Sequence, residues 1–112
     1  MKVLTLFEKV NRELQMSQHD FLSYYNDTIN EIVNLYGENL TLDGNSFIPC
    51  DDLSSDMCIN DAYFDAMVDN IVFLANPSDS QRKSEFLRKS KNAYNRIWSR
   101  HARTLKFVRR RF

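Results

Sequence analysis

Apolar residues recur at steps of three and four residues along four separate stretches of the chain, which is the spacing of an amphipathic α-helix. We predict a first helix that begins between Val3 and Thr5, and further helices over residues 18–36, 61–75 and 80–103. Only two Gly and two Pro residues occur, which disfavours a β-sandwich or a barrel because these folds need many turns. The sequence therefore predicts an all-α protein with one small domain.

The same spacing predicts which residues form the core and where the helices begin. Thr5 and Glu8 have the pattern of a capping box, and Ser17 and Asn60 are placed as N-caps. The expected buried residues are Leu6, Phe7, Val10 and Leu14 in the first helix, Phe21, Leu22, Tyr25, Ile29, Ile32, Val33 and Tyr36 in the second, Tyr63, Phe64, Met67, Ile71, Leu74 and Ala75 in the third, and Phe86, Leu87, Ser90, Ala93, Tyr94, Ile97, Trp98 and His101 in the fourth.

Residues 38–59 lose the helical period, and we expect a long irregular loop between the second and third helices. Asp43-Gly44 suits a tight turn, so residues 40–48 can form a small β-hairpin. An acidic linker that can include a helical turn follows at residues 50–56. Subunit contact is the expected use of the long segment that lacks firm structure. Cys50 and Cys58 lack the spacing of a zinc knuckle or a thioredoxin-like motif, and we expect two reduced, partly buried thiols rather than a disulfide.

Positive charge is concentrated at the C-terminal end of the chain. Residues 82–112 contain twelve of the fifteen Lys and Arg residues and one acid, Glu85, whereas residues 1–81 contain three bases and fourteen acids. The two parts therefore carry formal charges of +11 and −11, which predicts that the basic part meets nucleic acid or an acidic protein surface, another copy of the chain included. We place the domain at residues 1–103 and a basic, docking C-terminal arm at residues 104–112.

No catalytic, metal or cofactor motif emerges from the sequence. His19 and His101 belong to no known catalytic pattern, and the acidic linker lacks the Gly and Glu of a calcium loop. Asp61, Asp65 and Asp69 fall on one face of the third helix. A metal-binding carboxylate cluster stays open for them, but a solvated face, or one that pairs with the basic helix of a neighbour, is favoured. We expect a non-enzymatic, intracellular protein without a cofactor, a signal peptide or a transmembrane span.

The order of the elements resembles a known family. A short helix reading VLTLFEKVNREL, a second amphipathic helix, an irregular segment, INDAYFDAMVDNIVFLAN, a polar break and a long helix reading FLRKSKNAYNRIWSRHAR are together similar to the head-tail connector proteins of tailed bacteriophages, also called adaptor or head-completion proteins. The resemblance covers about residues 3–103. It implies a four-helix, bundle-like adaptor fold with the long loop and the basic arm.

The resemblance also implies a virion structural protein at the capsid–tail junction, assembled in the host cytoplasm. Such proteins form a ring, usually of twelve subunits, below the portal, extend the channel for DNA ejection and present a surface to stopper or tail proteins. Expected portal or DNA contacts are Arg100, Arg103, Lys106, Arg109, Arg110, Arg111 and Phe112, and the expected subunit interface is Asp61, Asp65, Asp69, Arg88 and Arg96. The alternative is a small DNA-binding accessory protein that uses the basic C-terminal helix without reading base sequence.

Overall fold

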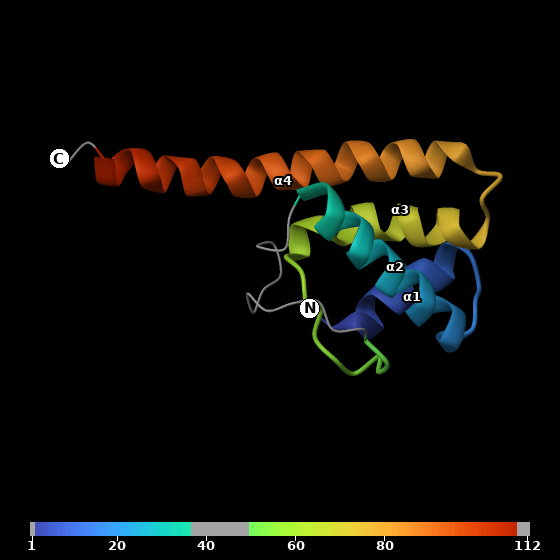
Figure 1. Ribbon diagram of the computed structural model, residues 1–112. Helices are drawn as coiled ribbons and strands as arrows, with labels where there is room; N and C mark the ends of the chain where they lie inside the picture. Colours follow the sequence, from blue (N-terminus) through green and yellow to red (C-terminus); the bar gives the residue numbers. More distant parts are fainter. Residues whose placement is uncertain (1, 37–49, 110–112) are drawn as a thin grey trace.

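The computed structural model describes the backbone of residues 2–36 and 50–109, and the side chains of residues 2–36 and 50–97. The helices in these ranges are α1 (Val3–Glu13), α2 (Gln18–Tyr36), the 3-10 turn η2 (Asp61–Tyr63), α3 (Phe64–Ala75) and α4 (Ser80–Arg109) (Figure 1). No strand occurs in the described ranges, so the predicted all-α class is confirmed for them. The β-hairpin expected at residues 40–48 lies outside the described residues.

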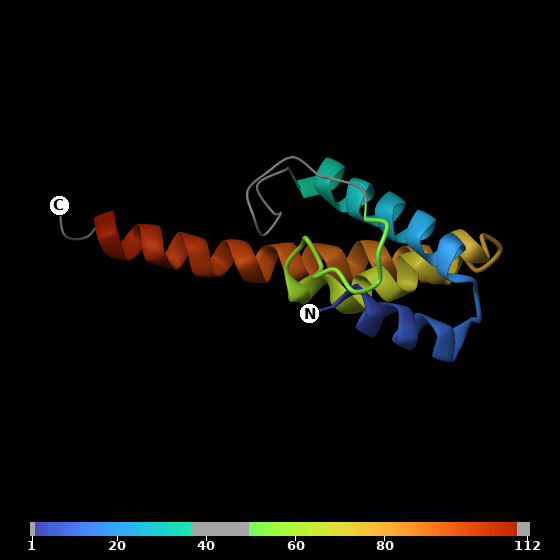
Figure 2. The same ribbon diagram turned by 90° about the horizontal axis from the view of Figure 1, so that it is seen from below.

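Helix α3 lies at the centre of the molecule. In Figure 1 it runs beneath the first half of α4, and Figure 2, seen from below, shows α1 on one side of α3 and α2 on the other. Every residue from Ala66 to Val72 is buried, because a helix with neighbours on most sides has no wide solvent face. The sequence predicted burial at Met67 and Ile71 correctly, but Val68 and Val72 are buried as well.

The predicted apolar stripes of α1 and α2 form the rest of the core. Leu6 and Val10 of α1 and Phe21, Ile29 and Ile32 of α2 are fully buried, which removes enough apolar surface from water to hold these short helices in place. Aromatic rings join the elements at both ends. Phe7 packs edge-on against Phe21 with a centroid distance of 5.0 Å, and Tyr36 stacks on Tyr94 of α4 at 4.7 Å.

The predicted N-caps are confirmed for two helices. Ser17 Oγ accepts a hydrogen bond of 3.1 Å from the backbone N–H of Asp20 at the start of α2. Asn60 Oδ1 accepts one of 2.8 Å from the N–H of Ala62, although the first turn of the predicted third helix is the 3-10 turn η2. These side chains satisfy backbone donors that have no partner inside the helix.

The predicted capping box of α1 is wrong. The helix begins at Val3, and its N-cap residue, Lys2, makes no side-chain capping bond. The backbone N–H groups of Val3 and Leu4 instead donate to the carbonyl oxygens of Ser55 and Leu53, each at 2.9 Å. A segment distant in sequence therefore caps α1, and local sequence reasoning does not detect such a partner.

Helix α4 is longer than predicted. It begins at Ser80 as expected but continues to Arg109, past the predicted end at Arg103, because no Gly or Pro interrupts it. Its C-terminal part extends beyond the other helices in both views (Figures 1 and 2). At about 1.5 Å per residue, α4 is on the order of 45 Å long. Leu87 was expected in the core but is 45% exposed.

Candidate interaction surface on helix α4

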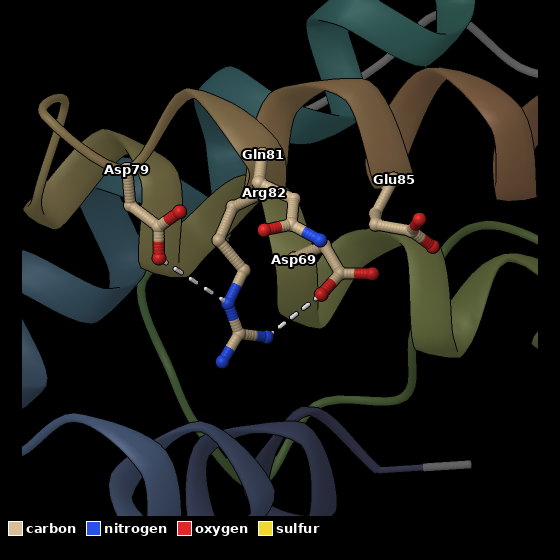
Figure 3. A pocket seen from close by; sticks show the side chains of 5 residues that line it. All are labelled: Asp69, Asp79, Gln81, Arg82 and Glu85. Atoms are coloured by element: carbon tan, nitrogen blue, oxygen red, sulfur yellow. Dashed lines mark hydrogen bonds and ion pairs between the residues drawn. The ribbon is translucent and has the colours of Figure 1, made fainter.

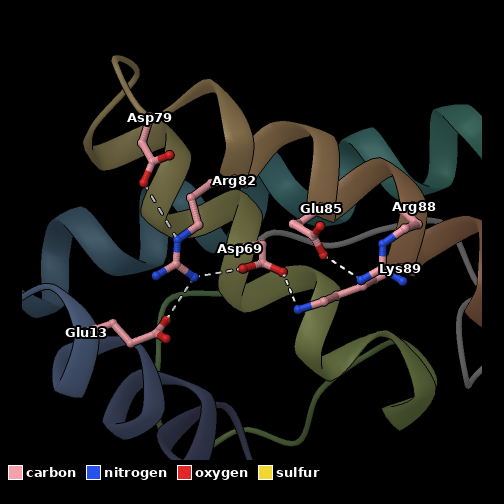
Figure 4. Close-up of polar contacts among 7 residues, drawn as sticks. All are labelled: Glu13, Asp69, Asp79, Arg82, Glu85, Arg88 and Lys89. Atoms are coloured by element: carbon pink, nitrogen blue, oxygen red, sulfur yellow. Dashed lines mark hydrogen bonds and ion pairs between the residues drawn. The ribbon is translucent and has the colours of Figure 1, made fainter.

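A buried carboxylate links α3 to the basic helix α4. Arg82 Nη1 donates to Asp69 Oδ1 at 2.8 Å and to Glu13 Oε2 at 3.3 Å. Its Nε lies 3.8 Å from Asp79 Oδ2, and Lys89 Nζ forms an ion pair with Asp69 Oδ2 at 2.7 Å (Figure 4). The Asp69 side chain is only 5% exposed, so two cations compensate one desolvated anion.

The contacts of Arg82 change its pKa. The hydrogen bond that Arg82 donates to Asp69, and then the charge of Glu13, raise the pKa of Arg82 above its ordinary value, although burial acts in the opposite direction. Beside the cluster lies an open cavity of about 290 Å³ lined by Asp69, Asp79, Gln81, Arg82 and Glu85 (Figure 3). Asp69 and Arg82, which line this cavity, already pair with each other, so their charges serve to hold α3 and α4 together.

A second polar cluster joins α2, α3 and α4. The side-chain amide of Asn70, which is fully buried, donates to Thr28 Oγ1 at 2.9 Å and to Glu31 Oε2 at 2.6 Å. Lys83 pairs with Glu31 and donates to Asn70 Oδ1 at 3.1 Å, and its ammonium lies 4.8 Å from the centre of the Phe86 ring. Each member has a partner, so this cluster fixes the packing of three helices.

A groove between α3 and α4 brings three of the predicted interface residues together. Asp65, Arg88 and Arg96 line it with Lys89 and Asn92, and the alanines 62, 66 and 93 complete the lining. Its volume is about 260 Å³. Asp65, Arg88 and Arg96 are exposed. Arg88 pairs with Glu85 at 2.5 Å, which raises the pKa of Arg88. Asp65 and Arg96 form no hydrogen bond or ion pair with the rest of the described chain.

Two other predicted interface residues differ in their surroundings. Asp61 is exposed in η2, whereas Asp69 is buried and ion-paired within its own chain. The expectation of an accessible acidic face therefore fails at Asp69. The four-residue spacing from Asp65 to Asp69 does place them on neighbouring turns of one side, but α4 covers that side at Asp69, as the contacts of Asp69 with Arg82 and Lys89 show.

The remaining predicted contact residues are only partly described. Arg100, Arg103, Lys106 and Arg109 belong to the part of α4 that extends beyond the other helices, but their side chains lie outside the described residues. Arg110, Arg111 and Phe112 lie outside them entirely.

The acidic linker is held by a side chain that sequence reasoning missed. Asn26 Nδ2 donates to the carbonyl oxygen of Cys50 at 2.9 Å, and the Cys50 N–H donates to Asn26 Oδ1 at 2.8 Å. This pair of hydrogen bonds resembles the pairing of two residues in neighbouring β-strands, and it fixes the linker on α2. Cys50 and Cys58 are half-buried and not bridged. No group of three or more His, Cys, Asp or Glu residues in the described chain could hold a metal ion.

Several other contributors to these clusters were also missed by sequence reasoning. Lys83 and Lys89 were counted only as part of the basic segment at residues 82–112, and Asn70 was not singled out. One signal was present, because Asp69 and Asn70 interrupt an otherwise apolar run from Ala66 to Ala75. Polar residues inside such a run are expected to be buried with partners.

Comparison with protein-family models, with curated proteins and with solved structures found no match. None of the helices in the described ranges is both long and apolar enough to span a membrane.

Proposed function

We propose that this chain is a virion structural protein of a tailed bacteriophage. In this proposal, copies of the chain form a ring below the portal, with a four-helix, bundle-like adaptor fold in each copy. The ring joins the capsid to the tail and extends the channel for DNA. The resemblance of residues 3–103 to head-tail connector proteins supports the proposal, as does the helical body.

The observation that carries the proposal is the position of the basic residues relative to the acidic body. Helix α4 leaves the body formed by α1, α2 and α3 (Figure 1), and Arg100, Arg103, Lys106 and Arg109 belong to its distal part. A long helix of this charge can reach a neighbouring protein or the DNA in a channel, while the acidic body remains available to another copy.

The charge distribution also favours a closed assembly. A contact between an acidic surface on one copy and a basic surface on the next is heterologous, so it repeats from copy to copy. When the rotation per step closes, the result is a ring without an unpaired end. The subunit number expected from the resemblance is twelve.

The mass of the protein in solution tests this proposal. Light scattering would be measured for the purified chain alone and after mixing with the portal protein of the same phage. A ring-sized particle, or a monomer that assembles only on the portal, is expected. A monomer or dimer that ignores the portal would contradict the adaptor proposal.

The distal part of α4 also supports a second candidate, a DNA-binding accessory protein. Lys and Arg along a helix neutralise phosphates without reading sequence. An electrophoretic titration with duplex DNA at several salt concentrations distinguishes the two candidates. Tight binding by the monomer, with a steep loss of affinity as salt rises, favours the accessory protein. Weak binding by the monomer favours the adaptor.

A further inference from the structure

The groove between α3 and α4 combines accessible charge with a shallow apolar lining. Arg88 and Arg96 are exposed and belong to α4, and the alanines 62, 66 and 93 provide small side chains between the charged residues. Arg96 has no ionic partner in the described chain. A groove of about 260 Å³ can accept a few side chains, and its free guanidinium favours carboxylates among them.

The chain itself carries a segment with matching chemistry at residues 51–56. Asp51, Asp52 and Asp56 are exposed, and the backbone between them is held, because Ser55 and Leu53 accept hydrogen bonds from the start of α1. This acidic segment is therefore presented in a fixed form, which lowers the entropic cost of binding.

The carboxylate of Asp52 is also held in its charged form. The Ser54 N–H donates to Asp52 Oδ1 at 2.9 Å, and the Ser54 hydroxyl donates to Oδ2 at 2.7 Å. These hydrogen bonds lower the pKa of Asp52.

Within one chain the acidic segment and the groove lie on different sides of α3. Figure 1 shows α4 above α3 and the acidic segment below it, next to the start of α1. An isolated antiparallel β-bridge joins the backbones of Lys2 and Asp56, and their side chains form an ion pair of 3.2 Å. These contacts hold the acidic segment next to the start of α1. The segment therefore cannot occupy the groove of its own chain, and a contact between them requires two copies.

We infer that the α3–α4 groove binds the acidic segment of a second copy of this chain, with Arg88 and Arg96 facing Asp51 and Asp52 across the interface. This inference rests on the proposed function and names the contact that joins successive copies. Each copy offers one groove and one acidic segment on different faces, so the contact is heterologous and propagates until a ring closes.

Charge reversal tests the contact, with assembly measured by light scattering at low and at physiological salt, alone and with the portal protein. A groove variant, Arg88→Glu with Arg96→Glu, and a segment variant, Asp51→Arg with Asp52→Arg, are each expected to weaken assembly at least about tenfold. A control variant, Lys9→Glu with Lys91→Glu, makes the same net charge change as the groove variant at exposed residues that line no part of the groove. It should assemble like the wild type. Circular dichroism checks that every variant keeps its helix content.

Two combinations make the pairing specific. A chain that carries all four reversals is expected to regain assembly, because the reversed charges are again complementary. An equimolar mixture of the groove variant and the segment variant is also expected to regain assembly, with the two variants alternating. The native groove of one variant meets the native segment of the other, and the reversed groove meets the reversed segment.

Several outcomes would overturn the inference. If both variants assemble normally while the wild type forms rings, the groove is not the contact and the adaptor proposal still stands. If the fourfold variant does not regain assembly, the two surfaces do not face each other. If the groove variant loses only portal binding, the occupant is the portal. If the wild type never assembles, with or without portal, the proposed function fails together with the inference.

Discussion

Asp69 Oδ1 on α3 lies 2.8 Å from Arg82 Nη1 on α4, and Lys89 Nζ lies 2.7 Å from the second oxygen of the same carboxylate. A single buried acid therefore attaches the first half of the basic helix to the body of the protein. Asp69 was expected to face a neighbouring copy, but its ion pairs lie within its own chain.

Replacing this acid tests how much the attachment contributes. Asp69→Asn keeps the shape of the side chain but removes its charge from two cations, so we expect the free energy of unfolding to fall by about 2 kcal/mol. Urea denaturation measures it. The matched control is Asp65→Asn, one turn earlier on the same helix and exposed, which should change stability by less than about 0.5 kcal/mol. Equal effects of the two substitutions would contradict a special role for Asp69.

The cluster around Asn70 predicts a second stability effect. Asn70→Ala removes the donor to Thr28 and Glu31 and the acceptor of Lys83, and so three hydrogen bonds of a buried side chain. We expect a loss of about 2 to 3 kcal/mol, measured by thermal unfolding. Asn30→Ala, at an exposed position of α2, is the control and should leave stability unchanged or slightly raised, because Ala favours helices. A comparable loss in both variants would count against the cluster.

The pairing of Asn26 with Cys50 makes a local prediction. Asn26→Ala removes both hydrogen bonds that fix this residue, so the Cys50 N–H should exchange with solvent at least about tenfold faster. Hydrogen exchange followed by NMR measures this. Asn34→Ala, on an exposed position of the same helix, should leave the rate unchanged. Unaltered exchange in Asn26→Ala would show that other contacts hold the segment.

Two buried tyrosines predict how stability changes in alkali. Burial raises the pKa of Tyr25 and of Tyr63 above the ordinary value of 10.0. For each tyrosine the unfolded state therefore loses its proton first, so the stability that each contributes is fully present below pH 10 and is lost as pH rises above it. Denaturation at pH 8 and pH 11 should show this loss. The variant Tyr25→Phe with Tyr63→Phe should lose less between the two pH values, and an identical loss would contradict the assignment.

The sequence was most informative where a local rule decides the structure. The range of α2, from Gln18 to Tyr36, follows from one apolar stripe and the Ser17 cap, and both are local features. The break at residues 76–79 and the start of α4 follow in the same way. In contrast, the end of α4 was predicted too early, because mixed apolar and basic residues were interpreted as an arm although nothing in their sequence breaks a helix.

The interaction surface was predictable only in part. The spacing of Arg88 and Arg96 on one helix is a property of the sequence, but their meeting with Asp65 depends on how α3 packs against α4. Asn26 and Cys50 are likewise joined by contacts that have no local signature.

By itself the sequence determined the helical class, the positions of most helices and the separation of an acidic part from a basic one, because periodicity, capping and charge are properties of neighbouring residues. Only the tertiary structure decided that α3 is the central helix, that Asp69 is buried while Asp65 is exposed, and that residues 53–55 cap α1. Each of these depends on which surfaces are packed together. Residues far apart in the chain then share one environment, and burial determines which charges remain available to a partner.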